Sequence, residues 1–106
     1  MSDQDRVREF SKTLFGSAYR LEVAAAIARA DPAVVNASDL VTALGLPPEK
    51  YGVVRLELQH FAKAGLLAPL PRPRGQRIQE YQRADSAYWN LSSSLMAESE
   101  AKSDRS

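Results

Sequence analysis

Residues 39–67 read DLVTALGLPPEKYGVVRLELQHFAKAGLL and predict two helices separated by a tight turn. Gly45 follows a short apolar-faced helix at the position where glycine commonly ends helices, because glycine adopts the left-handed backbone conformation without steric cost. Pro48 suits the first position of the next helix, where its missing N–H has no intrahelical partner in any case. Gly65 ends that helix as Gly45 ends the first. The stretch therefore predicts a helix-turn-helix whose second helix spans residues 48–64.

A β-hairpin is predicted directly after this second helix. Residues 66–70 form a short apolar run, and residues 78–83 alternate imperfectly between apolar and polar side chains. Between them, residues 71–77 (PRPRGQR) contain prolines and a glycine, which exclude a helix or a central strand. Another short strand is expected at residues 33–35. A helix-turn-helix followed by a hairpin with a basic tip is typical of a winged helix-turn-helix domain, mainly α-helical with a small β-hairpin.

Three more helices are predicted around this unit, at residues 1–15, at residues 18–30 and from Asp85 or Ser86 onward. Ser17 and Asn36 are expected to cap the helices that follow them. From about residue 99 the chain is polar and charged, which favours disorder. We therefore expect one winged-helix domain over residues 1–98, with a dimerisation helix at each end, and a disordered tail over residues 99–106.

The composition excludes several classes of chemistry. The 106 residues include no cysteine and a single histidine, His60. Disulfides, thiolate metal sites and cysteine nucleophiles are therefore excluded, and a Ser-His-Asp triad is not expected. No catalytic motif or phosphate-binding glycine loop is present. We expect no enzymatic activity, no metal and no cofactor. The lack of a secretory signal and of a long apolar run predicts a cytoplasmic protein with no membrane contact.

Three motifs are similar to those of ArsR-type transcriptional regulators: LFGSAYRL at residues 14–21, DLVTALGL at 39–46 and LQHFAKAGLL at 58–67. They resemble the start of that family's second helix, its scaffold helix and turn, and the end of its recognition helix with the first wing strand. The resemblance implies a dimeric bacterial transcriptional regulator whose first and last helices form the subunit interface. The turn around Pro47 and Pro48 is longer than usual in the family, and the cysteine ligands of its metal-sensing members are missing.

The positive charge is concentrated in the predicted recognition helix and wing. Residues 50–83 contain seven Lys or Arg and two Glu, which is a net charge of +5, whereas the whole chain carries +1 and the remainder therefore −4. A basic stripe on these two elements is where a winged helix meets the phosphate backbone of DNA. The alternative is a solvated basic loop. We expect duplex DNA to be the partner.

The candidate DNA-binding residues lie on both elements. They are Lys50, Tyr51, Gly52, Arg55 and Gln59 in the helix and Arg72, Arg74 and Arg77 in the wing. Arg55 can bond guanine and Gln59 adenine, whereas the wing arginines suit phosphates or a narrow minor groove. Leu56, the residue after Arg55, is a further candidate for contact with the bases. Glu57 is expected on the same face, where it either opposes phosphate or binds cytosine N4. His60 is expected to pack beneath the wing.

Apolar side chains follow one face of each terminal helix. They are Val7, Phe10 and Leu14 in the first helix and Tyr88, Trp89, Leu91 and Leu95 in the last. These side chains can pack on the core of their own chain or against a second copy. Because a small domain has a limited core of its own, we expect them to form a two-fold homodimer interface.

The sequence therefore favours a sequence-specific duplex-DNA-binding transcriptional regulator, expected to be a dimeric repressor. The alternative is a winged-helix protein–protein interaction module in a regulatory or phage-type assembly, without specific DNA binding. The modest net charge, Glu57 and the unusual Pro47-Pro48 start of the helix support that alternative. Nothing in the sequence specifies an effector ligand.

Overall fold

The computed structural model describes the backbone of residues 3–104 and the side-chain burial of residues 5–98. In chain order the elements are α1 (Asp3–Phe15), α2 (Arg20–Arg29), β1 (Val34–Val35), α3 (Ala37–Ala43), the 3₁₀ turn η1 (Pro48–Lys50), α4 (Tyr51–Lys63), β2 (Leu67–Pro69), β3 (Tyr81–Arg83) and α5 (Ala87–Asp104). The predicted fold class is confirmed: the described chain is mainly helical, with a small antiparallel sheet, and forms a winged helix-turn-helix.

The helix-turn-helix consists of α3, the turn at Gly45 and α4. Asn36 caps α3 as expected: its Oδ1 accepts a hydrogen bond from the Asp39 N–H at 2.8 Å, and its Nδ2 donates to Asp39 Oδ2 at 3.0 Å. Gly45 has a φ of 65°, which a residue with a Cβ adopts only with strain. Pro48 begins the turn of 3₁₀ helix that leads into α4. The helix end predicted from Gly45 is confirmed, and Pro48 does begin the helical segment, although the α-helix itself starts at Tyr51.

The three strands of the sheet lie in the order β1-β3-β2 and are antiparallel. Tyr81 of β3 pairs with Val35 of β1 on one side and with Pro69 of β2 on the other. The hairpin and the extra strand near residue 34 are therefore confirmed. Strand β3 is shorter than the predicted 78–83, because the pairing ends after the hydrogen bond from the Leu70 N–H to the Glu80 carbonyl. Pro71 has no N–H to continue it.

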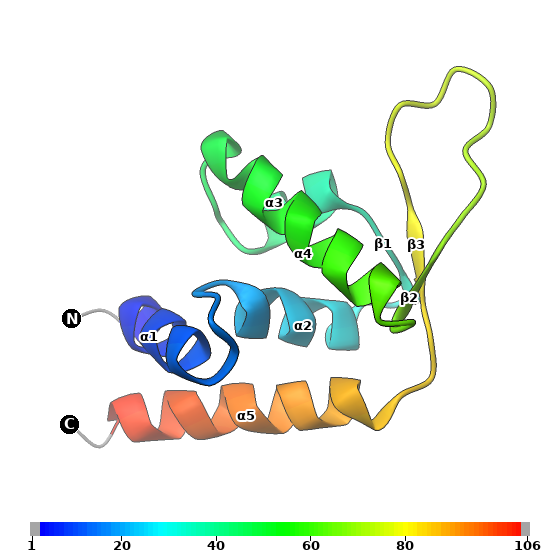
Figure 1. Ribbon diagram of the computed structural model, residues 1–106. Helices are drawn as coiled ribbons and strands as arrows, with labels where there is room; N and C mark the ends of the chain where they lie inside the picture. The colour runs from blue at the N-terminus through cyan, green and yellow to red at the C-terminus, as the bar shows by residue number, and fades with distance from the viewer. Residues whose placement is uncertain (1–2, 105–106) are drawn as a thin grey trace.

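The described chain forms two layers, as Figure 1 shows. Helices α1, α2 and α5 make the lower layer, with α5 running beneath the other two. Helices α3 and α4 lie above α2, and the wing projects upward from the sheet at the end of the molecule away from α1. The core lies between the layers, where Ile27 of α2, Leu58 of α4 and Trp89 of α5 are buried. Among the described residues, no helix is long and apolar enough to cross a membrane.

Two local predictions were wrong. Helix α5 continues to Asp104, so residues 99–104 are helical and not a disordered tail; residues 105–106 lie outside the described chain. The extension is reasonable because this segment contains Ala, Glu and Lys and no Gly or Pro. Ser17 does not cap α2, whose N-cap position is occupied by Tyr19 without a side-chain cap bond. The Ser17 hydroxyl instead donates to a buried carboxylate, that of Glu57.

Candidate nucleic-acid interface

Helix α4 has one buried and one exposed face. Val54, Leu58 and Phe61 are buried, as their spacing predicted. On the opposite side α4 exposes the predicted contact residues Tyr51, Gly52, Arg55 and Gln59, together with Leu56. Arg55 and Gln59 are one turn apart, so their side chains emerge from the same face of the helix.

The wing is the long connection between β2 and β3. Its tip is a turn in which the Gln76 N–H donates to the Pro73 carbonyl at 3.0 Å, and Gly75 supplies a φ of 89°. Below the tip, Arg72 Nη1 donates to the Arg77 carbonyl at 3.3 Å and joins the two sides of the loop. These internal bonds hold Arg72 and Arg77 opposite each other and leave Arg74 exposed in the tip.

A cleft of about 380 Å³ separates α4 from the wing. Five of the eight predicted DNA-binding residues line it: Tyr51, Arg55 and Gln59 from α4 and Arg72 and Arg77 from the wing. Tyr81 and Gln79 are also in its lining, and the Gln79 amide donates to the Leu70 carbonyl at 2.7 Å. The fold therefore brings together two groups of polar and basic side chains that are far apart in the sequence.

The other three predicted residues lie outside this cleft. Arg74 is exposed in the wing tip. Gly52 is exposed, and a Cβ added to it would meet nothing within 4 Å, so the backbone there is open to close approach. Lys50 is half-buried, and its Nζ lies 5.4 Å from the centre of the Tyr19 ring, a cation–π contact that directs it toward the start of α2.

Glu57 does not lie on the exposed face of α4, and the sequence interpretation was wrong on this point. It is only 5% exposed, and its carboxylate accepts hydrogen bonds from Ser17 Oγ at 2.6 Å and Arg20 Nε at 2.8 Å. Position 57 follows Val54 by three residues and precedes Leu58, so the helical spacing does place it on the inner face. The carboxylate is paired inside the domain, and the exposed face of α4 is free of acidic side chains.

His60 is also placed differently from the prediction. It is exposed on the side of α4 that faces α1 and α5, where its Nδ1 lies 3.2 Å from Arg20 Nη2. With Phe15 and Tyr88 it lines a separate depression of about 340 Å³. It does not pack beneath the wing, because the helix turns it away from Gln59 and toward Arg20.

Arg83 belongs to the basic segment of the sequence but not to the cleft. Its Nη1 donates to the carbonyls of Ile27, Ala28 and Ala30 at 2.8, 2.9 and 3.1 Å. A cation at the C-terminal end of a helix satisfies unpaired carbonyls and interacts favourably with the helix dipole. Arg83 therefore fixes the end of α2 against β3 and leaves the basic surface to α4 and the wing.

The candidate dimer residues divide into three groups by exposure. Val7 and Trp89 are 3% and 5% exposed within the single chain, so they belong to its own core and are not available to a second copy. Trp89 Nε1 donates to the Ala84 carbonyl at 2.9 Å, and its indole packs edge-on against Phe61. The half-buried group consists of Phe10, Tyr88 and Leu95. Leu14 and Leu91 are 52% and 54% exposed.

Comparison with known proteins identifies the fold. No protein-family model matches the chain, and no curated protein matches its sequence. A solved structure of the multiple antibiotic resistance repressor MarR superposes with a TM-score of 0.62 at 18% identity, covering 94% of this chain and 71% of that one. The oxidised form of MarR from E. coli gives 0.61 at 17% identity, with 95% and 70% coverage. At this identity the likeness supports the winged-helix fold alone.

Proposed function

We propose that this protein is a sequence-specific duplex-DNA-binding transcriptional regulator that acts as a dimeric repressor in the bacterial cytoplasm. The observation that carries the proposal is the cleft between α4 and the wing, where Arg55 and Gln59 face Arg72 and Arg77. Helix α4 enters the major groove, and the wing lies on the phosphate backbone or in the minor groove. The narrower assignment to ArsR-type regulators rests on the three sequence motifs and is part of this proposal.

The helix and the wing have different proposed roles because their side chains differ in chemistry. Arg55 can form two hydrogen bonds to guanine O6 and N7, and Gln59 can form two to adenine N6 and N7. Arg72, Arg74 and Arg77 supply charge to the backbone, which positions the protein but carries no sequence information. The pairing of Glu57 with Arg20 supports this arrangement, because it removes from α4 the one carboxylate that would repel phosphate.

The proposed dimer is supported by two exposed leucines. Leu14 of α1 and Leu91 of α5 are the most exposed of the candidate interface residues, and their helices pack side by side in the lower layer. A two-fold axis through this layer would place two α4 helices on one DNA face, at half-sites separated by about 34 Å, one helical turn. The buried Val7 and Trp89 support this surface from within and do not contact the second copy.

Selection of bound fragments from a pool of random duplex DNA, repeated at two salt concentrations, tests the proposal. We expect a recovered palindromic site and an affinity that falls with salt. The slope of log K against log salt should be steeper than about −3, because four or more phosphates are contacted. Recovery of no sequence preference, or binding that does not respond to salt, would exclude the proposed function.

A protein-interaction module remains the second candidate because of exposed apolar side chains near the same cleft. Tyr51, Leu56 and Ile78 are each at least 40% exposed. In a DNA complex they would contact thymine methyl groups or sugars. In a protein complex they would be the buried anchors. Replacing Leu56 and Ile78 by alanine distinguishes the two: a partner protein captured in stoichiometric amount by wild type and lost in this variant, without any DNA selected, would favour the module.

A further inference from the structure

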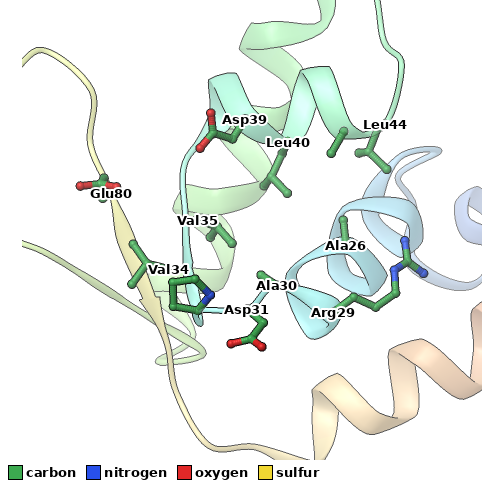
Figure 2. Close-up of a pocket in the computed structure, with 12 residues that line it drawn as sticks. Ala26, Arg29, Ala30, Asp31, Val34, Val35, Asp39, Leu40, Leu44 and Glu80 are labelled. Carbon is green, nitrogen blue, oxygen red and sulfur yellow. The ribbon is translucent and has the colours of Figure 1, made fainter.

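A second and larger cleft, of about 750 Å³, lies between the C-terminal end of α2, β1 and α3. It shares no lining residue with the cleft between α4 and the wing. Figure 2 shows the residues around it, with α2 on one side, α3 above and the strand residues Val34 and Val35 on the other. The volume is in the range of sites that enclose a small organic molecule.

The walls of this cleft are partly apolar, with charged side chains making up much of the remainder. The apolar part is formed by small and branched aliphatic side chains: Ala26, Ala30, Val34, Leu40, Ala43 and Leu44. Apolar walls of this kind favour the burial of hydrocarbon or aromatic groups, which contributes roughly 25 cal/mol per Å² of apolar surface removed from water. The alanines keep the cleft open, because a larger side chain at Ala26 or Ala43 would occupy it.

The charged residues of the cleft are mostly acidic. Asp31, Asp39 and Glu80 contribute three carboxylates from three different segments, against the single guanidinium of Arg29. In Figure 2 Asp39 and Glu80 lie on the side of β1, whereas the guanidinium of Arg29 points to the opposite side. The ion pairs of the described residues join Arg8 to Glu22 and Arg20 to Glu57, so none of these carboxylates is neutralised by an ion pair.

The acidic groups are spread around the cleft, and two of them accept side-chain hydrogen bonds. Glu80 Oε1 accepts a long one from Gln76 Nε2 at 3.5 Å. Asp39 Oδ2 accepts a hydrogen bond from Asn36 Nδ2, which fixes its carboxylate at the N-terminal end of α3. Within the described part of the chain, no three His, Cys, Asp or Glu side chains are close enough to hold a metal ion. The separated carboxylates therefore suit an organic cation. The charged centre of such a cation lies farther from each carboxylate than the length of a metal–oxygen bond.

From the apolar part of the lining, on α2 and α3, and the excess of carboxylates around it, we infer that this cleft binds a small organic cation with an apolar body, such as a lipophilic quaternary ammonium or phosphonium ion. The body occupies the space between α2 and α3, and the positive charge lies toward Asp39 and Glu80. An anion of the same shape is repelled by the excess of carboxylates, and a neutral molecule gains nothing from them. This inference does not depend on the proposed DNA binding.

The test measures binding of tetraphenylphosphonium and of tetraphenylborate, two ions of the same shape and opposite charge, by equilibrium dialysis against the full chain. We expect saturable, one-to-one binding of the cation and at least about tenfold weaker binding of the anion at the cleft. Amide chemical-shift changes, followed by NMR, should centre on Ala30, Val34 and Ala43. Cation binding that does not saturate, or shifts centred elsewhere, would overturn the inference.

A matched pair of double variants separates the cleft from general charge effects. Asp39→Asn with Glu80→Gln removes two carboxylates of the cleft, whereas Glu49→Gln with Asp85→Asn removes two exposed carboxylates outside it. We expect the first pair to weaken cation binding at least about tenfold and the second to leave it unchanged. An equal effect of both pairs would overturn the inference.

A third variant tests the apolar walls without changing the charge. Ala43→Leu should fill part of the cleft and weaken binding of the cation, and because Ala43 is exposed its replacement does not overpack the core. Far-ultraviolet circular dichroism and the midpoint of thermal unfolding show which variants are folded. Unchanged binding by folded Ala43→Leu would place the cation outside the cleft and overturn the inference.

Discussion

The carboxylate of Glu57 on α4 lies 2.8 Å from Nε of Arg20, the first residue of α2. The same guanidinium donates through Nη1 to the Phe15 carbonyl at 3.1 Å, at the end of α1. One partly buried ion pair therefore ties the proposed recognition helix to the turn between the two helices below it. Because α4 buries only one of its faces, its orientation depends strongly on contacts of this kind.

Removing the carboxylate should destabilise the domain. Glu57→Ala leaves Arg20 and Ser17 without their acceptor. Because the Arg20 side chain is 26% exposed and water can reach it, we expect the loss to cost about 1–3 kcal/mol. Glu49→Ala, which removes an exposed carboxylate of η1, is the control and should change the free energy of unfolding by less than about 0.5 kcal/mol. Urea unfolding followed by circular dichroism measures both. Equal stability of the two variants would contradict a structural role for the pair.

Glu22 should make the stability depend on pH. Burial raises the pKa of Glu22 from its ordinary value of 4.5, and the hydrogen bond from Arg8 opposes the shift. The folded state therefore keeps this proton to higher pH than the unfolded chain does. The resulting stabilisation is complete below the unfolded pKa and is lost as the pH rises through the folded pKa.

Comparison with Glu22→Gln isolates this contribution. As the pH is lowered from about 7 to about 4, the difference in unfolding free energy between wild type and variant should shift in favour of wild type. Glu9→Gln removes an exposed carboxylate from α1 and serves as the control for a change of net charge. A shift in the opposite direction, or the same shift in both variants, would show that burial of Glu22 is not the cause.

In the proposed dimer Leu14 and Leu91 lie in the interface, so charged substitutions at these positions should disrupt it. Replacing both by aspartate places two charges in each half of an apolar interface, so we expect the sedimentation coefficient to change from that of a dimer to that of a monomer. Thr42→Asp, at an exposed position of α3, adds a charge away from both terminal helices and should leave the dimer intact. A wild-type protein that sediments as a monomer at micromolar concentration would contradict the proposed interface.

Arg55 should determine sequence preference more than affinity. Arg55→Lys keeps the charge but loses the two-pronged hydrogen bonding to guanine, so binding to the selected site should weaken by about 1–3 kcal/mol while binding to unrelated DNA changes little. Fluorescence anisotropy with the selected and an unrelated duplex measures both affinities. Equal weakening on both duplexes would show that Arg55 contacts only the backbone.

The parts of the fold that depend on local chemistry could be predicted from the sequence. Gly45, Pro48 and Gly65 mark helix ends through their own backbone preferences, so the helix-turn-helix and the hairpin were found. The partner of Glu57 could not be found in this way, because it lies 37 residues away and is brought close only by the packing of α2 on α4. The spacing of Glu57 from Val54 and Leu58 nevertheless predicts the buried side of α4. Its negative charge was the reason for expecting the exposed side instead.

It was harder to predict which apolar side chains of the terminal helices are exposed, for a related reason. An apolar stripe shows that a face is buried but not what covers it, so Trp89 and Leu91 look alike in the sequence although one is in the core and the other is exposed. The cleft between α2 and α3 was not predicted, since its lining comes from four separate segments and includes no recognisable motif. The candidate residues on α4 and the wing could be named from the sequence because positive charge is concentrated in one continuous segment, and five of the eight line one cleft in the structure.

Binding of duplex DNA by the basic cleft and wing is tested most directly by the salt dependence of the affinity. Wild type should give a slope of log K against log salt steeper than about −3. Replacing Arg72, Arg74 and Arg77 together by alanine should make the slope shallower by about 0.9 for each phosphate that the protein no longer neutralises. Replacing Arg6, Lys12 and Arg29 by alanine removes the same charge elsewhere and should leave the slope nearly unchanged. Binding that is insensitive to salt, or equally reduced by the two triple variants, would contradict the proposed DNA binding.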